Sequence, residues 1–453
     1  MIHYLRLIRI VFLITVASTV VIANASWQHR PSLWSAETQI TNSPGDSRLV
    51  DLCTDPSGHT LYLTWEDNRE GMEEVYFKRS LDNGVTWGDE LRISHLTPGT
   101  LEPEPRVVAS GQQVIVFFAN RTATGEHLFY SVSNDQGNDF STPLKLTGDS
   151  GDQSNVAAAF VASTLHLVWQ QHFSDGEEHI FYTKSQNSGR TWQAEVALTN
   201  VSAAQDQYPA IAAVGDKVFV TWSRFYEGAE AIYAKVSLDS GNTWQPEAQV
   251  SAYAGEAYPE FPAIASNGTH VHLVWGSSAG IQYSRSSDSG ETWSSPIPLT
   301  NTSRQYVAPR IAVAASLIQV VTAGIIGGSS DVFYLNSSDG GQTWNAPLAL
   351  TAHEPTALSL APVISSNGEG TFVAWEDNRN GHFAVFFLSR PDFLLLGEFE
   401  RQLFISAVIV LAAVTSVYLG IELRASKQGS HRRNQRKRSH RSTKPHRRTK
   451  ARS

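Results

Sequence analysis

The segment Ser80-Leu-Asp-Asn-Gly-Val-Thr-Trp87 decides the fold, because related segments return along most of the chain. Successive copies start 49 to 53 residues apart, at Ser80, Ser133, Ser185, Ser237, Ser286 and Ser337. A period of about 50 residues is typical of one four-stranded blade of a β-propeller. The repeat therefore predicts an all-β chain.

Turn chemistry explains the composition of the segment. A carboxylate or amide at its third position can bond backbone groups of a tight turn, the Gly supplies a positive φ, and the Trp packs against the blade. We therefore interpret the third-position residues as structural. They are Asp82, Asp135, Asn187, Asp239, Asp288 and Asp339.

The same strand order surrounds each copy. A Pro- and Ala-rich strand comes first, an alternating strand ending in Trp second, an alternating strand before the Ser third, and a short strand fourth. Period-2 alternation, as in 166–169 and 180–183, favours strand over helix.

Counting strands predicts seven blades. Three strands, at 362–365, 371–376 and 384–389, follow the last segment without a fourth, whereas 34–41 aligns with 344–351. The N-terminal strand would complete the last blade and close the ring, which removes open edges. A six-bladed ring with an extra hairpin is the alternative.

The N-terminus has the pattern of a signal peptide. Arg6 and Arg9 precede an apolar run over 10–23, and Ala23-Asn24-Ala25 fits a cleavage site. Residues 1–25 are therefore expected to be removed. An uncleaved anchor is the alternative, although the run is short for a span of about 20 residues.

The C-terminal region predicts a membrane anchor. Residues 403–421 form an uncharged apolar stretch, and the tail 422–453 carries thirteen of the 35 Lys and Arg residues. The positive-inside rule places this tail in the cytoplasm. The prediction is thus a single-pass cell-membrane protein with an extracellular propeller at 34–390 and a stalk at 391–402. The acidic propeller disfavours nucleic acid, and the basic tail favours anionic lipid.

The repeated segment resembles the Asp-box, or bacterial neuraminidase repeat, and the chain resembles the sialidase superfamily of propellers over residues 34–390. In that family the box lies on the face opposite the active site and occurs in many proteins without hydrolytic activity, so the box itself says little about activity.

The resemblance implies a definite catalytic set: three arginines that hold the substrate carboxylate, a Tyr nucleophile with a Glu, and an Asp acid/base. The candidates at the starts of first strands are Arg48, Arg106 and Arg310, with Tyr306 nearby. Guanidinium groups bind carboxylates in a bidentate manner. However, the family's Phe/Tyr-Arg-Ile-Pro signature is absent, and nothing identifies the Asp.

Acidic residues recur in the loops that lead from one blade to the next. If these loops surround one mouth of the channel, they favour a cation or cationic ligand, or form a solvated rim without a ligand. They are Asp46, Glu102, Glu104, Asp149, Asp152, Asp206, Glu256, Glu260 and Glu354.

A second motif, Trp-Glu-Asp-Asn-Arg-x-Gly, occurs at 65–71 and 375–381. Its oxygens could hold Ca²⁺, and its arginines could contact a partner. Turn chemistry, with Asp67 bonding Arg69 locally, is the preferred interpretation of this motif, whose second copy contains Asp377 and Arg379. No Cys/His metal motif is found in the sequence, so no metal site is assigned.

The complete repeat without a complete catalytic set leads to one preferred function. We expect a non-enzymatic cell-surface propeller that binds a glycan or a protein in adhesion. An exo-sialidase-type glycoside hydrolase and an extracytoplasmic assembly scaffold are the alternatives.

Overall fold

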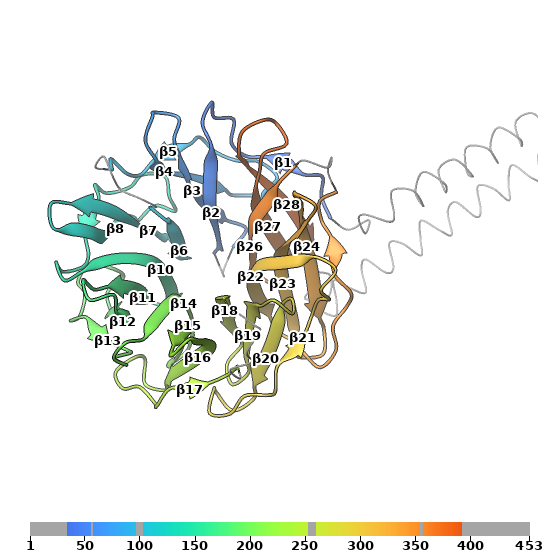
Figure 1. Ribbon diagram of the computed structural model, residues 1–453. Coiled ribbons are helices and arrows are strands. Elements are labelled where there is room, and N and C mark those ends of the chain that lie inside the picture. Colours follow the sequence, from blue (N-terminus) through green and yellow to red (C-terminus); the bar gives the residue numbers. More distant parts are fainter. Residues whose placement is uncertain (1–33, 56–57, 97–102, 252–259, 353–356, 392–453) are drawn as a thin grey trace, which may run out of the picture. The chain divides into compact units, whose positions relative to one another are not determined.

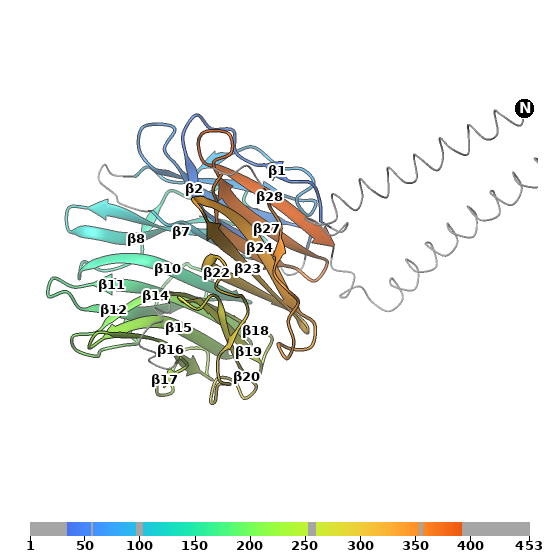
Figure 2. The ribbon, with the colours of Figure 1, turned by 45° about the vertical axis from the view of Figure 1, so that its right-hand side comes forward.

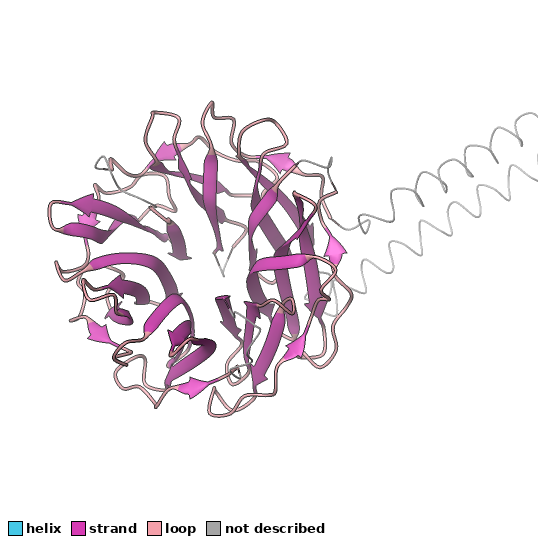
Figure 3. Ribbon diagram, viewed as in Figure 1, coloured by secondary structure: helices cyan, strands magenta, loops and turns pink. Residues whose placement is uncertain are grey.

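The computed structural model describes residues 34–55, 58–96, 103–251, 260–352 and 357–391, and the regular elements of these ranges are all β-strands (Figure 3). The all-β prediction is therefore confirmed. Within the same ranges no helix has the length and apolarity that a membrane crossing requires. The predicted signal peptide, membrane helix and basic tail, and the stalk beyond Pro391, lie outside the described residues.

The strands follow one another in groups of four. The groups along the chain are β2 (Ser47–Thr54), β3 (Leu61–Asp67), β4 (Glu74–Ser80), β5 (Leu91–Arg92); β6 (Arg106–Ser110), β7 (Gln113–Thr122), β8 (Gly125–Ser133), β9 (Leu144–Lys145); β10 (Asp152–Val161), β11 (Thr164–His172), β12 (Glu178–Ser185), β13 (Val196–Ala197); β14 (Gln205–Val214), β15 (Lys217–Tyr226), β16 (Ala229–Ser237), β17 (Ala248–Gln249); β18 (Glu260–Ser266), β19 (Val271–Gly276), β20 (Gln282–Ser286), β21 (Ile297–Pro298); β22 (Gln305–Ala314), β23 (Leu317–Ile326), β24 (Ser329–Ser337), β25 (Leu348–Ala349); and β26 (Ser359–Ser366), β27 (Gly370–Asp377), β28 (Ala384–Pro391) with β1 (Thr38–Gln39).

These groups are antiparallel sheets arranged around an axis (Figures 1 and 2). Two of them, β10–β13 and β14–β17, are joined into one eight-stranded sheet by a parallel pairing of Glu178 with Gln205. The first strands contact one another in the closed order β2, β6, β10, β14, β18, β22, β26 and back to β2. The inner wall is therefore built from first strands.

The N-terminal strand closes the last group. In β1, Thr38 lies opposite Phe387 and Gln39 opposite Phe386 of β28, which makes β1 the outer strand of that sheet. Beyond β1, the Ile40 amide donates to the Val385 carbonyl over 2.8 Å. The first and last described strands thus share one sheet, as the alignment of 34–41 with 344–351 predicts.

Side chains between neighbouring sheets form the core. Five buried tryptophans stand near the ends of second strands, and apolar clusters join each sheet to the next. Burial of this apolar surface is the main source of stability. The five are Trp65, Trp169, Trp222, Trp275 and Trp375.

The repeated segments form the turns after the third strands. In the first, the Ser80 hydroxyl donates to Asp82 Oδ1 and accepts from the Gly84 amide, each over 2.8 Å. The Thr86 amide also donates to Asp82 over 2.8 Å. The Ser-to-third-position and Gly-to-Ser bonds recur in all six segments, so their structural interpretation agrees with the geometry. We call this end of the sheets the box face and the opposite end, where first strands begin, the entry face.

Candidate functional site

Every first strand has the same kink near its start on the entry face. One residue in each strand, or just before it in the case of β6, adopts a left-handed conformation, with φ between 42° and 53°, and six of the seven strands shift register there. Such bulges turn a side chain toward a new direction and recur beside functional sites. The left-handed residues are Leu49, Glu104, Asn155, Tyr208, Phe261, Ala308 and Ala361.

The residues two positions later line a common cavity of about 190 Å³. They are Asp51, Arg106, Ala157, Ala210, Ala263, Arg310 and Val363. Because each first strand contributes one of them, this cavity lies where the inner strands meet. Four of these seven side chains are apolar, so the polar chemistry of this ring comes from one aspartate and two arginines.

Arg106 and Arg310 make this cavity locally cationic. Each donates a guanidinium hydrogen bond to the carbonyl of the proline before it, over 3.0 Å and 3.2 Å. Burial and, to a smaller extent, the charge of Arg106 lower the pKa of Arg310 to about 10, although Asp51 and Glu104 oppose the shift. Asp51 itself accepts the Val107 amide over 2.9 Å. An anionic group entering the cavity would therefore stabilise both guanidinium groups.

An aromatic pair stands at the same cavity. The rings of Tyr208 and Phe261 have their centroids 4.4 Å apart, and both residues line the cavity together with Asn155. Burial raises the pKa of Tyr208, and nearby carboxylates, Glu260 first, add to the shift, so the phenol stays neutral. The cavity thus combines an apolar surface with an amide and two guanidinium groups.

Arg48 does not reach this cavity. It precedes the kink of β2, and its guanidinium lies over the Phe383 ring, 3.9 Å from the centroid. It also lies near Glu376, whose pKa is raised by burial while Arg48 opposes the shift. Asp51, not Arg48, occupies the position equivalent to Arg106 and Arg310.

Tyr306 belongs to a different cavity, of about 470 Å³, which Arg304 and Glu260 also line. Its ring is buried edge-on against Phe333, with centroids 5.4 Å apart. The three candidate clamp arginines and the candidate nucleophile Tyr306 are therefore not gathered in one pocket: Arg106 and Arg310 are together, and Arg48 and Tyr306 lie elsewhere.

The two Asp-Asn-Arg motifs are turn clamps. The Nε atoms of Arg69 and Arg379 each donate over 2.8 Å to the aspartate two residues earlier. A further donor of each arginine binds a carboxylate that directly precedes a fourth strand, Glu90 in one case and Glu37 in the other. The arginines also lie over aromatic rings. These donors are directed inward rather than toward a partner.

The motif carboxylates are engaged in the same way. Burial raises the pKa of Asp67, but hydrogen bonds from Arg69, Ser47 and Ser43 outweigh this effect and hold the pKa below its usual value. The pKa of Asp377 is lowered in the same way, by hydrogen bonds from Arg379 and Ser359. Within the described ranges no group of three His, Cys, Asp or Glu side chains is placed to hold a metal ion. Binding of Ca²⁺ at these motifs stays a prediction.

Arg224 forms a third clamp that sequence reasoning missed. It binds Asp206, with Nε to Oδ1 at 2.6 Å, and Glu247, and its guanidinium lies over the Tyr233 ring. Asp206, predicted as part of an acidic rim, is instead fully buried in this ion pair. The Trp-x-Arg spacing at 222–224 differs from the Trp-x-x-x-Arg spacing of the other two motifs, so no common sequence pattern identifies this clamp.

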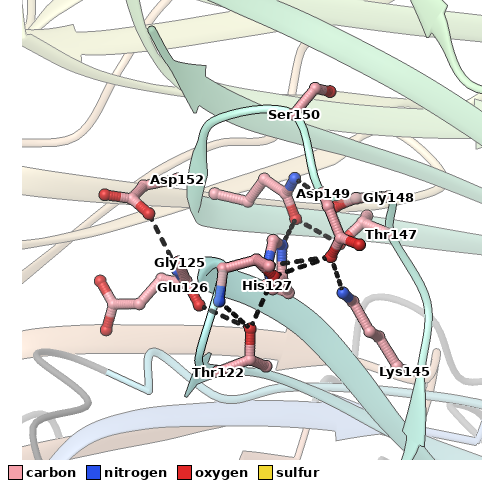
Figure 4. A network of polar contacts seen from close by, with 12 residues as sticks. Thr122, Gly125, Glu126, His127, Lys145, Thr147, Gly148, Asp149, Ser150 and Asp152 are labelled. Carbon is pink, nitrogen blue, oxygen red and sulfur yellow. Dashed lines mark hydrogen bonds and ion pairs between the residues drawn. The ribbon is translucent and has the colours of Figure 1, made fainter. Parts of the chain in front are cut away.

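The remaining predicted loop acids have mixed roles. Glu104 accepts the Asn155 amide over 2.6 Å, and Glu260 lines the second cavity. Glu102 lies outside the described residues. Figure 4 shows Asp149 bound to Lys145 and close to His127, and Asp152 accepting the Glu126 amide over 2.9 Å. Several of these carboxylates therefore hold loops together.

The cavity residues that sequence reasoning missed are Asp51, Asn155, Tyr208 and Phe261. A signal for two of them was present, since a Pro-x-apolar triplet follows Tyr208 and Phe261 as it follows Glu104 and Ala308. Aligning first strands on that proline places the next residue of each in the cavity wall.

No protein-family model and no curated protein matches this chain. Among solved structures, an ulvan lyase of polysaccharide lyase family 25 has 11% identity and a TM-score of 0.56, covering 77% of this chain and 95% of its own. An ulvan lyase bound to -[GlcA(1-4)Rha3S]- has 12% identity and a TM-score of 0.55, covering 79% of this chain and 95% of its own. Trypanosoma rangeli sialidase has 13% identity and a TM-score of 0.48, covering 82% of this chain and 57% of its own. The likeness to the lyase shows a shared fold, a β-propeller.

Proposed function

We propose that this chain is a membrane-anchored cell-surface propeller that binds a glycan at the cavity of its inner strands. The observation that carries the proposal is the joint placement of the Tyr208–Phe261 pair, Arg106 and Arg310 in one cavity wall. Pockets that bind small ligands combine apolar surface with a few converging polar groups. An aromatic face offers apolar area to a sugar ring, and guanidinium groups suit a carboxylate or sulfate on it.

The class of glycan follows from the charge of the wall. Two guanidinium groups outnumber the single carboxylate of Asp51 among the seven ring positions, which favours a saccharide with an acidic substituent. A saccharide is also the ligand in the ulvan lyase complex of the same fold. Fold alone does not transfer a ligand, so the local chemistry is the stronger support.

The rest of the proposal concerns architecture. Seven four-strand groups whose first strands contact in a closed order support a seven-bladed ring among the described residues. The apolar stretch at 403–421 and the basic tail support anchoring, with the propeller outside the cell.

A glycan array carrying neutral, uronate, sialylated and sulfated saccharides tests the proposal on the full-length protein, purified in detergent. We expect retention of acidic saccharides. Tyr208→Ala should weaken it about tenfold or more, because an aromatic side chain at the centre of an interface carries much of its energy. Arg106→Gln should weaken retention of acidic saccharides only.

Two exposed residues provide matched controls. Phe225→Ala removes a partly exposed ring, and Arg190→Gln an exposed guanidinium, neither of which lines the cavity. Both should leave retention unchanged. A folded protein that retains no saccharide, or equal losses from the cavity and control variants, contradicts glycan binding at this cavity.

A further inference from the structure

Ser154, His172 and Glu178 form a continuous hydrogen-bonded chain on the entry face. The Ser154 hydroxyl lies 2.8 Å from His172 Nε2, and His172 Nδ1 lies 2.8 Å from Glu178 Oε1. From this geometry we propose that Ser154 is the nucleophile of an esterase site, with His172 as its general base and Glu178 as the residue that positions the imidazole. The same arrangement of nucleophile, base and orienting carboxylate serves acyl transfer on unrelated folds.

Glu178 is held as an acceptor, which fixes the imidazole tautomer. Its other oxygen, Oε2, accepts amide hydrogens from Gln170 over 3.0 Å and from Gln207 over 2.5 Å. Burial raises the pKa of Glu178, but the hydrogen bonds from His172 and Gln207 outweigh this effect and keep the pKa below its usual value. An ionised Glu178 accepts the Nδ1 proton of His172, so Nε2 is left to accept from the Ser154 hydroxyl.

The charges around His172 favour a basic imidazole. The hydrogen bond to Glu178 raises the pKa of His172, and the charges of Asp152 and Glu104 raise it further, whereas burial opposes this rise. The side chain retains 36% exposure, so a substrate has access. A base whose pKa lies near the working pH is effective in general base catalysis.

Asn155 supplies a donor beside the nucleophile. Its side-chain amide nitrogen lies 3.4 Å from the Ser154 oxygen and donates to Gln170 Oε1 over 2.9 Å. An amide hydrogen at this place suits the negative oxygen that forms when a hydroxyl attacks an ester. Asn155 also lines the central cavity, so an ester there would be next to Ser154.

The proposed reaction is hydrolysis of a carboxylic ester. Ser154 Oγ bonds to the ester carbon as its proton passes to His172 Nε2; the carbon–oxygen bond to the alcohol then breaks, and the alcohol takes that proton. Water attacks the acyl-serine and gives a proton to His172, and the acid leaves as the serine regains its proton. Ester and water become alcohol and acid, without a cofactor. This activity goes beyond glycan binding and does not depend on it.

The test uses p-nitrophenyl acetate and a fluorophosphonate probe with the full-length protein. We expect hydrolysis and labelling of one serine, identified by peptide mass spectrometry as Ser154. Ser154→Ala should abolish labelling, and His172→Gln should slow hydrolysis by about 100-fold or more. Glu178→Gln should also move the acid limb of the pH–rate profile to lower pH, because His172 would lose the partner that raises its pKa.

Matched variants separate a catalytic from a structural role. Ser110 bonds the Ala162 carbonyl, and His59 pairs with Glu369 on the box face, so Ser110→Ala and His59→Gln should leave labelling unchanged. In a second measurement, the thiol of Ser154→Cys should react with iodoacetamide faster than that of Ser110→Cys, since His172 favours the thiolate. Labelling that persists in Ser154→Ala, no labelling of the folded protein, or equal thiol rates would overturn the proposal.

Discussion

The Tyr182 hydroxyl contacts two residues: it lies 2.8 Å from His166 Nδ1, and it packs against Gly241 in the repeated segment of the next four-strand group. Tyr283 makes the same two contacts with His272 and Gly341. The glycine of the segment therefore does more than supply a positive φ. It also leaves room for an aromatic side chain of the preceding group, which ties the turn to the packing between groups.

Gly241→Ala should destabilise the protein more than a left-handed glycine elsewhere. A Cβ at Gly241 would overlap the Tyr182 hydroxyl, whereas one at Gly215, also at positive φ, meets nothing within 4 Å. We expect losses of about 1 kcal/mol for Gly215→Ala and about 3 kcal/mol or more for Gly241→Ala in urea unfolding. Adding Tyr182→Phe should recover part of the larger loss. Equal losses at the two glycines would show that overlap is unimportant.

His166 and His272 should make the protein sensitive to mild acid. Burial lowers the pKa of each to about 4, with nearby cations adding to the shift. The unfolded chain, with a histidine pKa near 6.5, binds more protons between these values, so stability falls as pH drops from about 6.5 to 4. We expect a loss on the order of 2 kcal/mol per histidine. His166→Gln should flatten the dependence of the urea midpoint on pH, and an unchanged dependence would contradict this assignment.

Asp239→Asn should preserve the turn but alter its response to stronger acid. Bonds from the Thr243 amide and hydroxyl lower the pKa of Asp239 to about 2, below the unfolded value near 3.9. Its contribution is thus present above about pH 4 and lost as pH falls toward 2. Asn187 already forms the equivalent turn, accepting the Thr191 amide over 2.9 Å. The difference in thermal midpoint between Asp239→Asn and the parent should shrink from pH 7 to pH 2.5; a constant difference would contradict the assignment.

The fold was predictable because its determinants are local and repeated. Each segment carries its own Ser, Asp or Asn, and Gly, and the segments return about every 50 residues, so turn chemistry and repeat period agree. The N-terminal closure could be inferred because 34–41 resembles 344–351. These features need no knowledge of distant contacts.

The site was less predictable because a backbone kink determines which side chains face the cavity. Arg48 and Asp51 are three residues apart, and the bulge between them gives Asp51 the position that Arg310 has in its own strand. A one-residue slip in a strand exchanges its two faces, so pattern matching on arginine alone selected Arg48, which does not line this cavity. The His172–Glu178 pair spans a hairpin, and Ser154 joins it from another strand, which no local motif reports.

Arg379 and Glu37 should be coupled in stability. They connect the turn after β27 to the segment before β1. The pair is largely screened from solvent, and Arg379 also binds Asp377, so its geometry is fixed. In a double-mutant cycle with Arg379→Gln and Glu37→Gln, we expect a coupling energy of about 1 kcal/mol or more. The matched cycle, Arg69→Gln with Glu90→Gln, repeats the contact in the first group, where it does not hold a terminal strand.

The two cycles should differ in cooperativity. If β1 closes the ring, losing Arg379 or Glu37 should broaden the urea transition, because the outer strand of the last sheet can separate before the rest unfolds. The Arg69 and Glu90 variants should shift the midpoint without broadening it. Broadening in both sets, or in neither, would mean that this contact has no particular part in closure.

Arg310→Met should stabilise the protein while weakening retention of acidic saccharides. Burial and the neighbouring Arg106 both lower the pKa of Arg310, which means that its charged form is less favourable in the cavity than in water. Replacing such a charge with an apolar side chain of similar length removes that cost, and we expect a gain of about 1 kcal/mol in urea unfolding. Arg190→Met, at an exposed position, should change stability by less than about 0.5 kcal/mol.

The pair Arg106 and Arg310 also predicts non-additivity. Either Arg→Met change relieves their mutual repulsion, so the double variant should gain less stability than the sum of the single variants. If the variants gain stability but retain acidic saccharides less well, the result would fit a site that keeps two like charges close together for a ligand's anionic group. If Arg310→Met destabilises the protein whether or not Arg106 is present, the guanidinium contributes packing and hydrogen bonding that outweigh its charge, and the cationic character assigned to the cavity would be wrong.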